Sequence, residues 1–113
     1  MFDLQKFNED CLLIREESPL IHNITNYVAM DTVANALLAV GASPIMSAAP
    51  EEIIEIVSKC NAAAINIGTP DQQSVKASRI AAAAAKQFGK PWVLDPVGAG
   101  FTNMRTKIAT DLA

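Results

Sequence analysis

The chain has 113 residues, half of them apolar and 19% charged, and its nine basic and twelve acidic residues give a formal net charge of −3. This composition fits one compact domain and excludes a disordered coil, because disordered chains lack the apolar surface that offsets chain entropy. The net negative charge disfavours binding to nucleic acid, which needs a basic surface. No apolar run approaches the roughly 20 residues that span a bilayer.

The compartment is predicted from the N-terminus and the cysteines. No basic segment leads into an apolar stretch at the N-terminus, so the pattern differs from that of a signal peptide. Cys11 and Cys60 lie far apart and form no C-x-x-C pair, which favours two buried thiols in a reducing environment. A single histidine leaves a zinc site short of ligands. We therefore expect a cytoplasmic protein that does not bind a membrane.

The first half of the chain predicts two helices, each followed by a short strand. A helix is expected over residues 2–17, ended by Ser18-Pro19, and a second over residues 27–40, ended by Gly41. Strands are expected at residues 20–22 and 44–46. The residues expected to face inward are Phe2, Leu4, Phe7, Cys11 and Ile14 on the first helix, and Met30, Ala34, Leu37 and Leu38 on the second.

The second half continues the alternation. A third helix is expected over residues 50–60 with Pro50 in its first turn, followed by a buried strand at residues 62–67. The fourth helix should begin with Thr69 as its cap and Gln72 completing a capping box, and should end near Gly89. A strand at residues 92–94 and a helix from Thr102 complete the pattern. That last helix has no stop signal before Ala113, so we expect the chain to be cut within it.

Strands that alternate with helices predict the α/β class. Such β-α-β units form a parallel sheet with right-handed crossovers and with helices on both faces. The predicted strands are continuous apolar runs, as expected for strands buried on both sides. We therefore predict a single domain, residues 1–113, with helices layered over a parallel sheet.

Polar or glycine residues follow each predicted strand. They are Asn23, Thr25 and Asn26; Met46-Ser47; Gly68-Thr69; and the segment 95–100, Asp-Pro-Val-Gly-Ala-Gly. Ligands of open α/β sheets bind outside the carboxyl ends of the strands, where helix N-termini also offer free N–H groups. The four loops should therefore meet at one edge, which is the predicted site.

Each candidate residue also has a purely structural interpretation. Thr25 or Asn26 can simply cap the next helix, Met46 can be a core residue, and Gly68 can serve a turn. Asp95 suits Mg²⁺ or phosphate binding, because magnesium commonly binds one or two carboxylates together with substrate phosphates, yet it can also be a turn aspartate. Asn66 within an apolar strand must have hydrogen-bonding partners.

Several familiar motifs are absent. The segment Gly98-Ala99-Gly100 is not a dinucleotide fingerprint, because Asn103 stands where the third glycine would fall. The G-x-x-x-x-G-K-[ST] phosphate loop does not occur, and no Ser/His/Asp triad or Cys/His pair can be assembled. His22 has no acidic or cysteine neighbour in sequence, which favours a structural over a catalytic histidine.

Four segments in order resemble the hydroxyethylthiazole kinase family. They are His22-Asn-Ile-Thr-Asn-Tyr-Val28, residues 33–46 (VANALLAVGASPIM), Asn66-Ile-Gly-Thr69 and residues 94–100 (LDPVGAG). The resemblance implies a ribokinase-like fold. It also implies ATP- and Mg²⁺-dependent phosphorylation of the primary alcohol of 4-methyl-5-(2-hydroxyethyl)thiazole, a salvage step of thiamine synthesis, and a homotrimer with thiazole sites between subunits.

The same resemblance assigns roles to individual residues. Thr25, Asn26, Val28 and Met46 would line the thiazole pocket, Gly68 would contribute from the adjoining subunit, and Asp95 would lie on the Mg²⁺–phosphate side. Members of the family are longer, and the part without a counterpart here carries most of the ATP site, the glycine-rich anion hole and the catalytic cysteine. Residues 1–113 would then be the N-terminal part of one kinase domain, without a catalytic residue of their own and inactive alone.

Two other classes of function remain open. Another ribokinase-like enzyme, a hydroxymethylpyrimidine kinase or a nicotinamide-hydrate dehydratase, could also place an aspartate and glycines at a strand end, but would lack the opening at residues 22–26. A non-catalytic α/β module that binds a small molecule or a protein partner is the second alternative.

Overall fold

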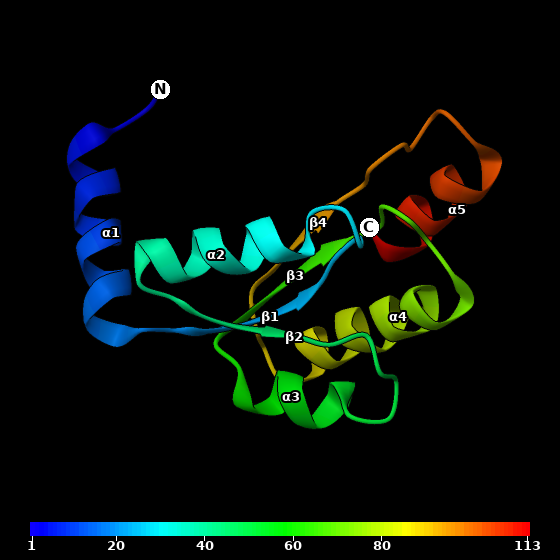
Figure 1. Cartoon of the computed structure of the whole chain (residues 1–113), viewed down its shortest axis with the longest axis horizontal. Helices are drawn as coiled ribbons and strands as arrows, with labels where there is room; N and C mark the ends of the chain where they lie inside the picture. The colour runs from blue at the N-terminus through cyan, green and yellow to red at the C-terminus, as the bar shows by residue number, and fades with distance from the viewer.

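The structure is a computed structural model that describes residues 1–113 (Figure 1). Helices and strands alternate along the whole chain, as predicted. Their bounds are α1 Leu4–Glu17, β1 Leu20–Ile24, α2 Met30–Val40, β2 Ser43–Met46, α3 Ile53–Lys59, β3 Ala62–Asn66, α4 Gln72–Gln87, β4 Trp92–Asp95 and α5 Asn103–Leu112.

The four strands form one parallel sheet in the order β2-β1-β3-β4. Helix α2 packs against β2 on one face, and α4 packs against β1 and β3 on the other, with α3 and α5 beside it (Figure 1). This confirms the predicted α/β class with helices on both faces. All four strands run the same way, so their carboxyl ends lie along the same edge.

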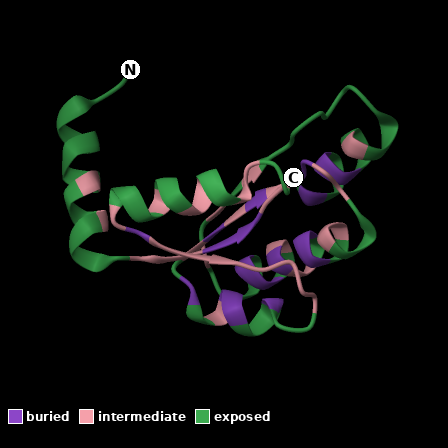
Figure 2. Ribbon diagram, viewed as in Figure 1, coloured by how far each residue is buried: buried purple, intermediate pink, exposed green.

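The core lies between the sheet and the layer of α3, α4 and α5 (Figure 2). Ile24 and Ile65 come from the sheet, and Ile53 and Val57 from α3. The alanines of α4 lie fully or almost fully buried at four positions: Ala77, Ala81, Ala84 and Ala85. Their small side chains let the helix approach the sheet closely.

The opposite side of the molecule is thinly covered, which contradicts part of the expected core. Helix α1 has no buried residue, and Phe2, Leu4 and Phe7 are more than half exposed. Leu38 of α2, predicted to face inward, is 58% exposed. Figure 2 shows both helices largely as exposed surface, because no second layer of chain lies over them. The spacing of apolar residues therefore predicted the helices correctly, but it does not determine which part of the chain covers the apolar face of each helix.

Several helix starts also differ from the prediction. Helix α2 begins at Met30 and not at residue 27, and helix α3 begins at Ile53 and not at Pro50, since residues 27–29 and 50–52 form turns. Helix α4 is capped by Asp71, whose carboxylate accepts from the N–H of Ser74 while the Ser74 hydroxyl accepts from the N–H of Asp71. This is a capping box two residues later than the one predicted from Thr69 and Gln72. A carboxylate at the cap position satisfied the free N–H groups in place of Thr69.

None of the helices combines the length and the apolar character needed to cross a membrane. Both cysteines are free thiols, Cys60 fully buried and Cys11 only partly buried. The prediction of two buried thiols is therefore right for Cys60 alone.

Candidate functional site

The loops that follow the four strands meet at one edge of the sheet. Backbone hydrogen bonds continue past the strand ends, from the N–H of Ser47 to the carbonyl of Asn23 (3.2 Å) and from the N–H of Ile67 to the carbonyl of Asp95 (3.2 Å). Neighbouring loops are thus tied together in pairs. This confirms the geometric expectation on which the predicted site depended.

Asn66 joins three of these loops through its side-chain amide. Its Oδ1 accepts from Asn26 Nδ2 and from the backbone N–H of Gly68, both at 2.9 Å, and its Nδ2 donates to Asp95 Oδ2 at 2.7 Å. The Asn26 side chain in turn accepts from the N–H of Ala29 at 2.9 Å, in the turn that leads into α2. The polar residue predicted to need partners therefore has three.

Gly68 is packed too closely for any side chain. A Cβ built there would lie 2.8 Å from Asn26 Cβ and 3.0 Å from both Asn26 Nδ2 and Asn66 Oδ1. Its glycine identity is explained by close approach and not by a positive φ. Gly68 and Asn26 are thus in contact within one chain.

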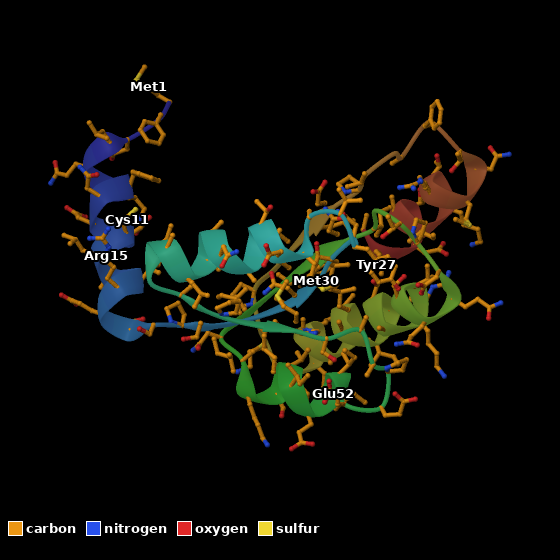
Figure 3. All side chains as sticks on the ribbon, viewed as in Figure 1. Met1, Cys11, Arg15, Tyr27, Met30 and Glu52 are labelled. Carbon is orange, nitrogen blue, oxygen red and sulfur yellow. The ribbon has the colours of Figure 1, made fainter.

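A second network links the loop after β1 to the start of α4. The N–H of Tyr27 donates to Thr69 Oγ1 (3.1 Å), and the Tyr27 hydroxyl donates to Asp71 Oδ2 (2.6 Å). Because the tyrosine donates to a carboxylate, the pKa of Tyr27 is raised. The donors Ser74 and Tyr27 lower the pKa of Asp71, since they stabilise its charged form. Figure 3 shows Tyr27 and Met30 at this edge, with Cys11 and Arg15 at the far end of the sheet.

Two small cavities open among these loops. One of about 100 Å³ reaches from the loop after β1 to those after β2 and β3, and its lining includes Thr25, Met46 and Thr69. The other, of about 230 Å³, reaches from β1 to β4 and includes Thr25, Asn66 and Asp95. Thr25 lines both, and its Oγ1 is buried without a hydrogen-bond partner. A buried hydroxyl without a partner is costly, so this atom marks a point where a polar group is needed.

The structure gathers most, but not all, of the predicted site residues. Thr25 and Met46 line a cavity, and Asn26 and Gly68 lie beside it through the Asn66 network. Val28 is 86% exposed and lines neither cavity. Sequence reasoning missed Tyr27, which lines the smaller cavity and whose only signal was its position at the end of the polar stretch after the first predicted strand. Asn23, which the sequence placed at this edge, lines both cavities.

His22 is fully buried on the other side of β1 and lines neither cavity. Its Nε2 lies 3.0 Å from the carbonyl of Ser47, which can only accept, so Nε2 carries the proton. Nδ1 is buried without a partner. Burial lowers the pKa of His22, against opposing contributions from Ser47 and Glu52. This arrangement agrees with the structural interpretation of the histidine.

Asp95 is the single carboxylate that lines these cavities. One of its oxygens accepts from Asn66, and it takes part in no ion pair. No group of three or more His, Cys, Asp or Glu side chains is close enough to hold a metal ion. The residues present therefore fit a Mg²⁺ that arrives with substrate phosphates, which needs only one or two carboxylates, and do not fit a metal held by protein ligands alone.

The glycine segment after Asp95 is a preformed turn. Gly98 and Gly100 have positive φ, at 77° and 88°. The N–H of Gly100 donates to Thr106 Oγ1 at 2.8 Å and that of Ala99 to the carbonyl of Pro96 at 3.0 Å. Thr106 of α5 and the carbonyl of Pro96 thus engage these two N–H groups, and the glycines shape the turn.

Comparison with known proteins gives one family throughout. A sequence model described as "Hydroxyethylthiazole kinase family" matches residues 12–113. The chain is 57% identical over 97 residues to the hydroxyethylthiazole kinase of Leptospira biflexa, and 54% identical over 99 residues to that of Pyrococcus furiosus. These alignments cover 86% and 88% of this chain.

A solved structure described as the hydroxyethylthiazole kinase protein from Pyrococcus horikoshii OT3 has the same architecture, with a TM-score of 0.94 at 47% identity over 96% of this chain. The chain spans only part of each relative: 36% of the Leptospira protein, 37% of the Pyrococcus furiosus protein and 43% of the solved chain.

Proposed function

The chain belongs to the hydroxyethylthiazole kinase family, and on that premise we propose that it supplies the alcohol-binding edge of an ATP-dependent kinase that phosphorylates 4-methyl-5-(2-hydroxyethyl)thiazole in thiamine salvage. We propose further that residues 1–113 are the N-terminal part of one ribokinase-like domain. The observation that carries the proposal is the joining of three strand-end loops by Asn66, which lines the larger cavity.

The smaller cavity is the proposed place of the thiazole ring. Met46 and Met30 give it apolar walls, which suit a polarisable sulfur heterocycle, while Thr25 adds a hydroxyl. Asn26 and Gly68 shape the loop behind it, and Val28 is proposed to contact the ring from outside the cavity. At about 100 Å³ the cavity is smaller than the roughly 300–1,000 Å³ of typical ligand sites. This supports the proposal that a neighbouring subunit of a homotrimer completes the pocket.

Asp95 is proposed to hold Mg²⁺ on the phosphate side of the site. When bound, the ion would neutralise charge on the phosphates of ATP. The exposed carboxylate of Asp95 lies in the larger cavity, and Asn66 orients one of its oxygens. Thr25 lines both cavities, so an alcohol in the smaller one would lie near the carboxylate. We propose that the protein acts in the cytoplasm, binds no nucleic acid and binds no membrane.

A kinase assay tests the function. The assay uses the full-length protein with ATP and Mg²⁺. This protein should phosphorylate the thiazole alcohol in preference to hydroxymethylpyrimidine. Thermal unfolding should be shifted upward by the thiazole alcohol and not by pyrimidine or nicotinamide ligands, because a ligand that binds only the native state stabilises it. Preference for the pyrimidine would assign the protein to another ribokinase-like activity.

Met46→Ala should weaken binding of the thiazole alcohol in the same assay. Met104→Ala is the matched control, because Met104 is an exposed methionine of α5 that lines neither of the two cavities. Equal effects of the two substitutions would contradict the proposed pocket.

Residues 1–113 expressed alone should give no measurable turnover, and turnover like that of a complete kinase would overturn that expectation.

A further inference from the structure

The side chain of Asn66 reaches three loops of the site from its position at the end of β3. Asn66 is the last residue of β3, a central strand, and it is paired with Asp95 at the end of β4. On the other side of β3, Ile65 is paired with Ile24 at the end of β1. The strand order therefore places Asn66 between the loop that carries Asn26 and the carboxylate of Asp95.

The three hydrogen bonds fix the orientation of the amide. Oδ1 faces two N–H donors, on Asn26 and Gly68, and Nδ2 faces a carboxylate oxygen. A flipped amide would set an NH₂ group against two donors and a carbonyl oxygen against Asp95, so all three bonds would be lost. Asn66 thus has one stable orientation, in which the amide connects a neutral loop to a charged group.

No other side-chain hydrogen bond reaches the Asp95 carboxylate. The hydrogen bond from Asn66 to Asp95 Oδ2 therefore sets the direction in which Asp95 Oδ1 points. The same amide holds Asn26 and the N–H of Gly68 at the edge of the proposed alcohol pocket. The placement of the alcohol and the placement of the carboxylate are therefore set by one residue.

We propose that Asn66 is a positioning residue, which holds the Asp95 carboxylate in register with the loop that binds the alcohol. This inference rests on the proposed kinase function. Phosphoryl transfer depends mainly on alignment and charge stabilisation, and a displacement of about 1 Å can cost about 100-fold in rate. A residue that aligns two halves of the site should therefore affect kcat more than binding of the alcohol.

The substitution Asn66→Asp separates the two halves of the network. The new carboxylate can still accept from Asn26 and Gly68, so the alcohol loop keeps its support. Its other oxygen would take the place of Asn66 Nδ2, which lies 2.7 Å from Asp95 Oδ2 in the wild type. Two negative charges so close repel each other, so the link to Asp95 is lost while the bonds to the alcohol loop remain.

The test compares kinetics of the full-length protein and its variants at pH 8. For N66D we expect a KM for the alcohol close to that of the wild type and a kcat about 10- to 100-fold lower.

Asn61→Asp is the matched control. Asn61 lies at the other end of β3, where its Oδ1 accepts from the N–H of Leu20 at 2.8 Å, and N61D keeps that acceptor. The control should not show the kcat loss.

Each outcome decides the inference. If wild-type protein has no kinase activity, the proposed function fails, whatever the variants do. If the wild type is active and N66D matches N61D in kcat, Asn66 does not position Asp95 and the inference is wrong. If N66D does not fold, the substitutions Asn66→Ser and Asn61→Ser are compared in its place. A loss of kcat of at least about tenfold for N66S alone supports the inference. Equal kcat values for N66S and N61S overturn it.

Discussion

Gly68 and His22 illustrate how single residues are constrained by their surroundings at this edge of the sheet. Gly68 is fixed by space, because Asn26 and Asn66 occupy the volume of a side chain. His22 is fixed by burial, because one ring nitrogen donates to the carbonyl of Ser47 and the other has no partner. Each constraint has a measurable consequence for stability.

Gly68→Ala should destabilise the protein by about 1–3 kcal/mol, because the added methyl group overpacks a site with Asn26 at 2.8 Å. Urea unfolding measures the free energy of unfolding. Gly89→Ala is the control: nothing lies within 4 Å of its Cβ position, so only its positive φ of 65° is strained. G68A alone should shift the side-chain amide resonances of Asn26 and Asn66. Unchanged resonances would show that the packing at Gly68 is looser than described.

The free energy of unfolding should fall as the pH drops from about 7 toward 5. Burial lowers the pKa of His22 in the folded state, so the unfolded chain binds a proton first, below its ordinary pKa of about 6.5. The stability is fully present above that pH and is lost as the pH falls, with a slope of at most about 1.4 kcal/mol per pH unit for one proton. His22→Gln should abolish this slope. Since the chain has one histidine, a slope that persists in H22Q would contradict the assignment.

At the scale of elements, the start of helix α4 anchors a loop of the site, and the two edge strands of the sheet differ in how they are protected. The capping box of Asp71 and Ser74 starts α4, and the same Asp71 carboxylate receives the Tyr27 hydroxyl from the loop after β1. One cap therefore both begins a helix and anchors a site loop. At the sheet edges, β2 carries Pro44, which lacks an N–H for pairing, while β4 has no such protection.

Asp71→Ala should lower the stability by about 0.5–2 kcal/mol, the usual cost of losing a helix cap. Gln72→Ala should change it by less than about 0.5 kcal/mol, because Gln72 forms none of the bonds of the box. Thermal or urea unfolding of the two variants distinguishes the capping box that the structure forms from the one that Thr69 and Gln72 predicted. A larger loss for Q72A would reverse that conclusion.

At the scale of the whole molecule, the two faces of the sheet are unequally covered. The face with α3, α4 and α5 carries the core, whereas the helices at the other face, α1 and α2, have no buried residue. Leu12, Leu13 and Leu38 are at least half exposed, and so is Val93 on the free edge of β4. Large exposed apolar areas and free strand edges promote association between molecules.

Residues 1–113 should therefore self-associate as the concentration rises, as sedimentation velocity or light scattering would measure. Val93→Lys should reduce the association, because a charge on an edge strand opposes edge-to-edge pairing. Ile54→Lys is the control, since Ile54 is similarly exposed but lies on α3, away from the β4 edge. A heat-stable monomer of the wild-type chain at all concentrations would count against the prediction.

The sequence by itself determined the order and type of the elements, the parallel sheet and the edge at which polar loops gather. These follow from local rules, because apolar periodicity and turn residues act over a few neighbouring positions, and parallel strands end on one side. The resemblance of four segments also identified the family that the comparisons confirm.

Only the tertiary structure decided which residues meet within that edge and which apolar stripes are covered. The bond between Asn26 and Asn66 and the close approach of Asn26 to Gly68 join residues about forty positions apart, and the bond between Asn66 and Asp95 joins residues 29 apart. Strand order sets the distances between them. The exposure of α1 and Leu38 likewise depends on what packs over them and not on their spacing. Contacts between distant segments arise from the packing of whole elements, and the local pattern of one element does not contain them.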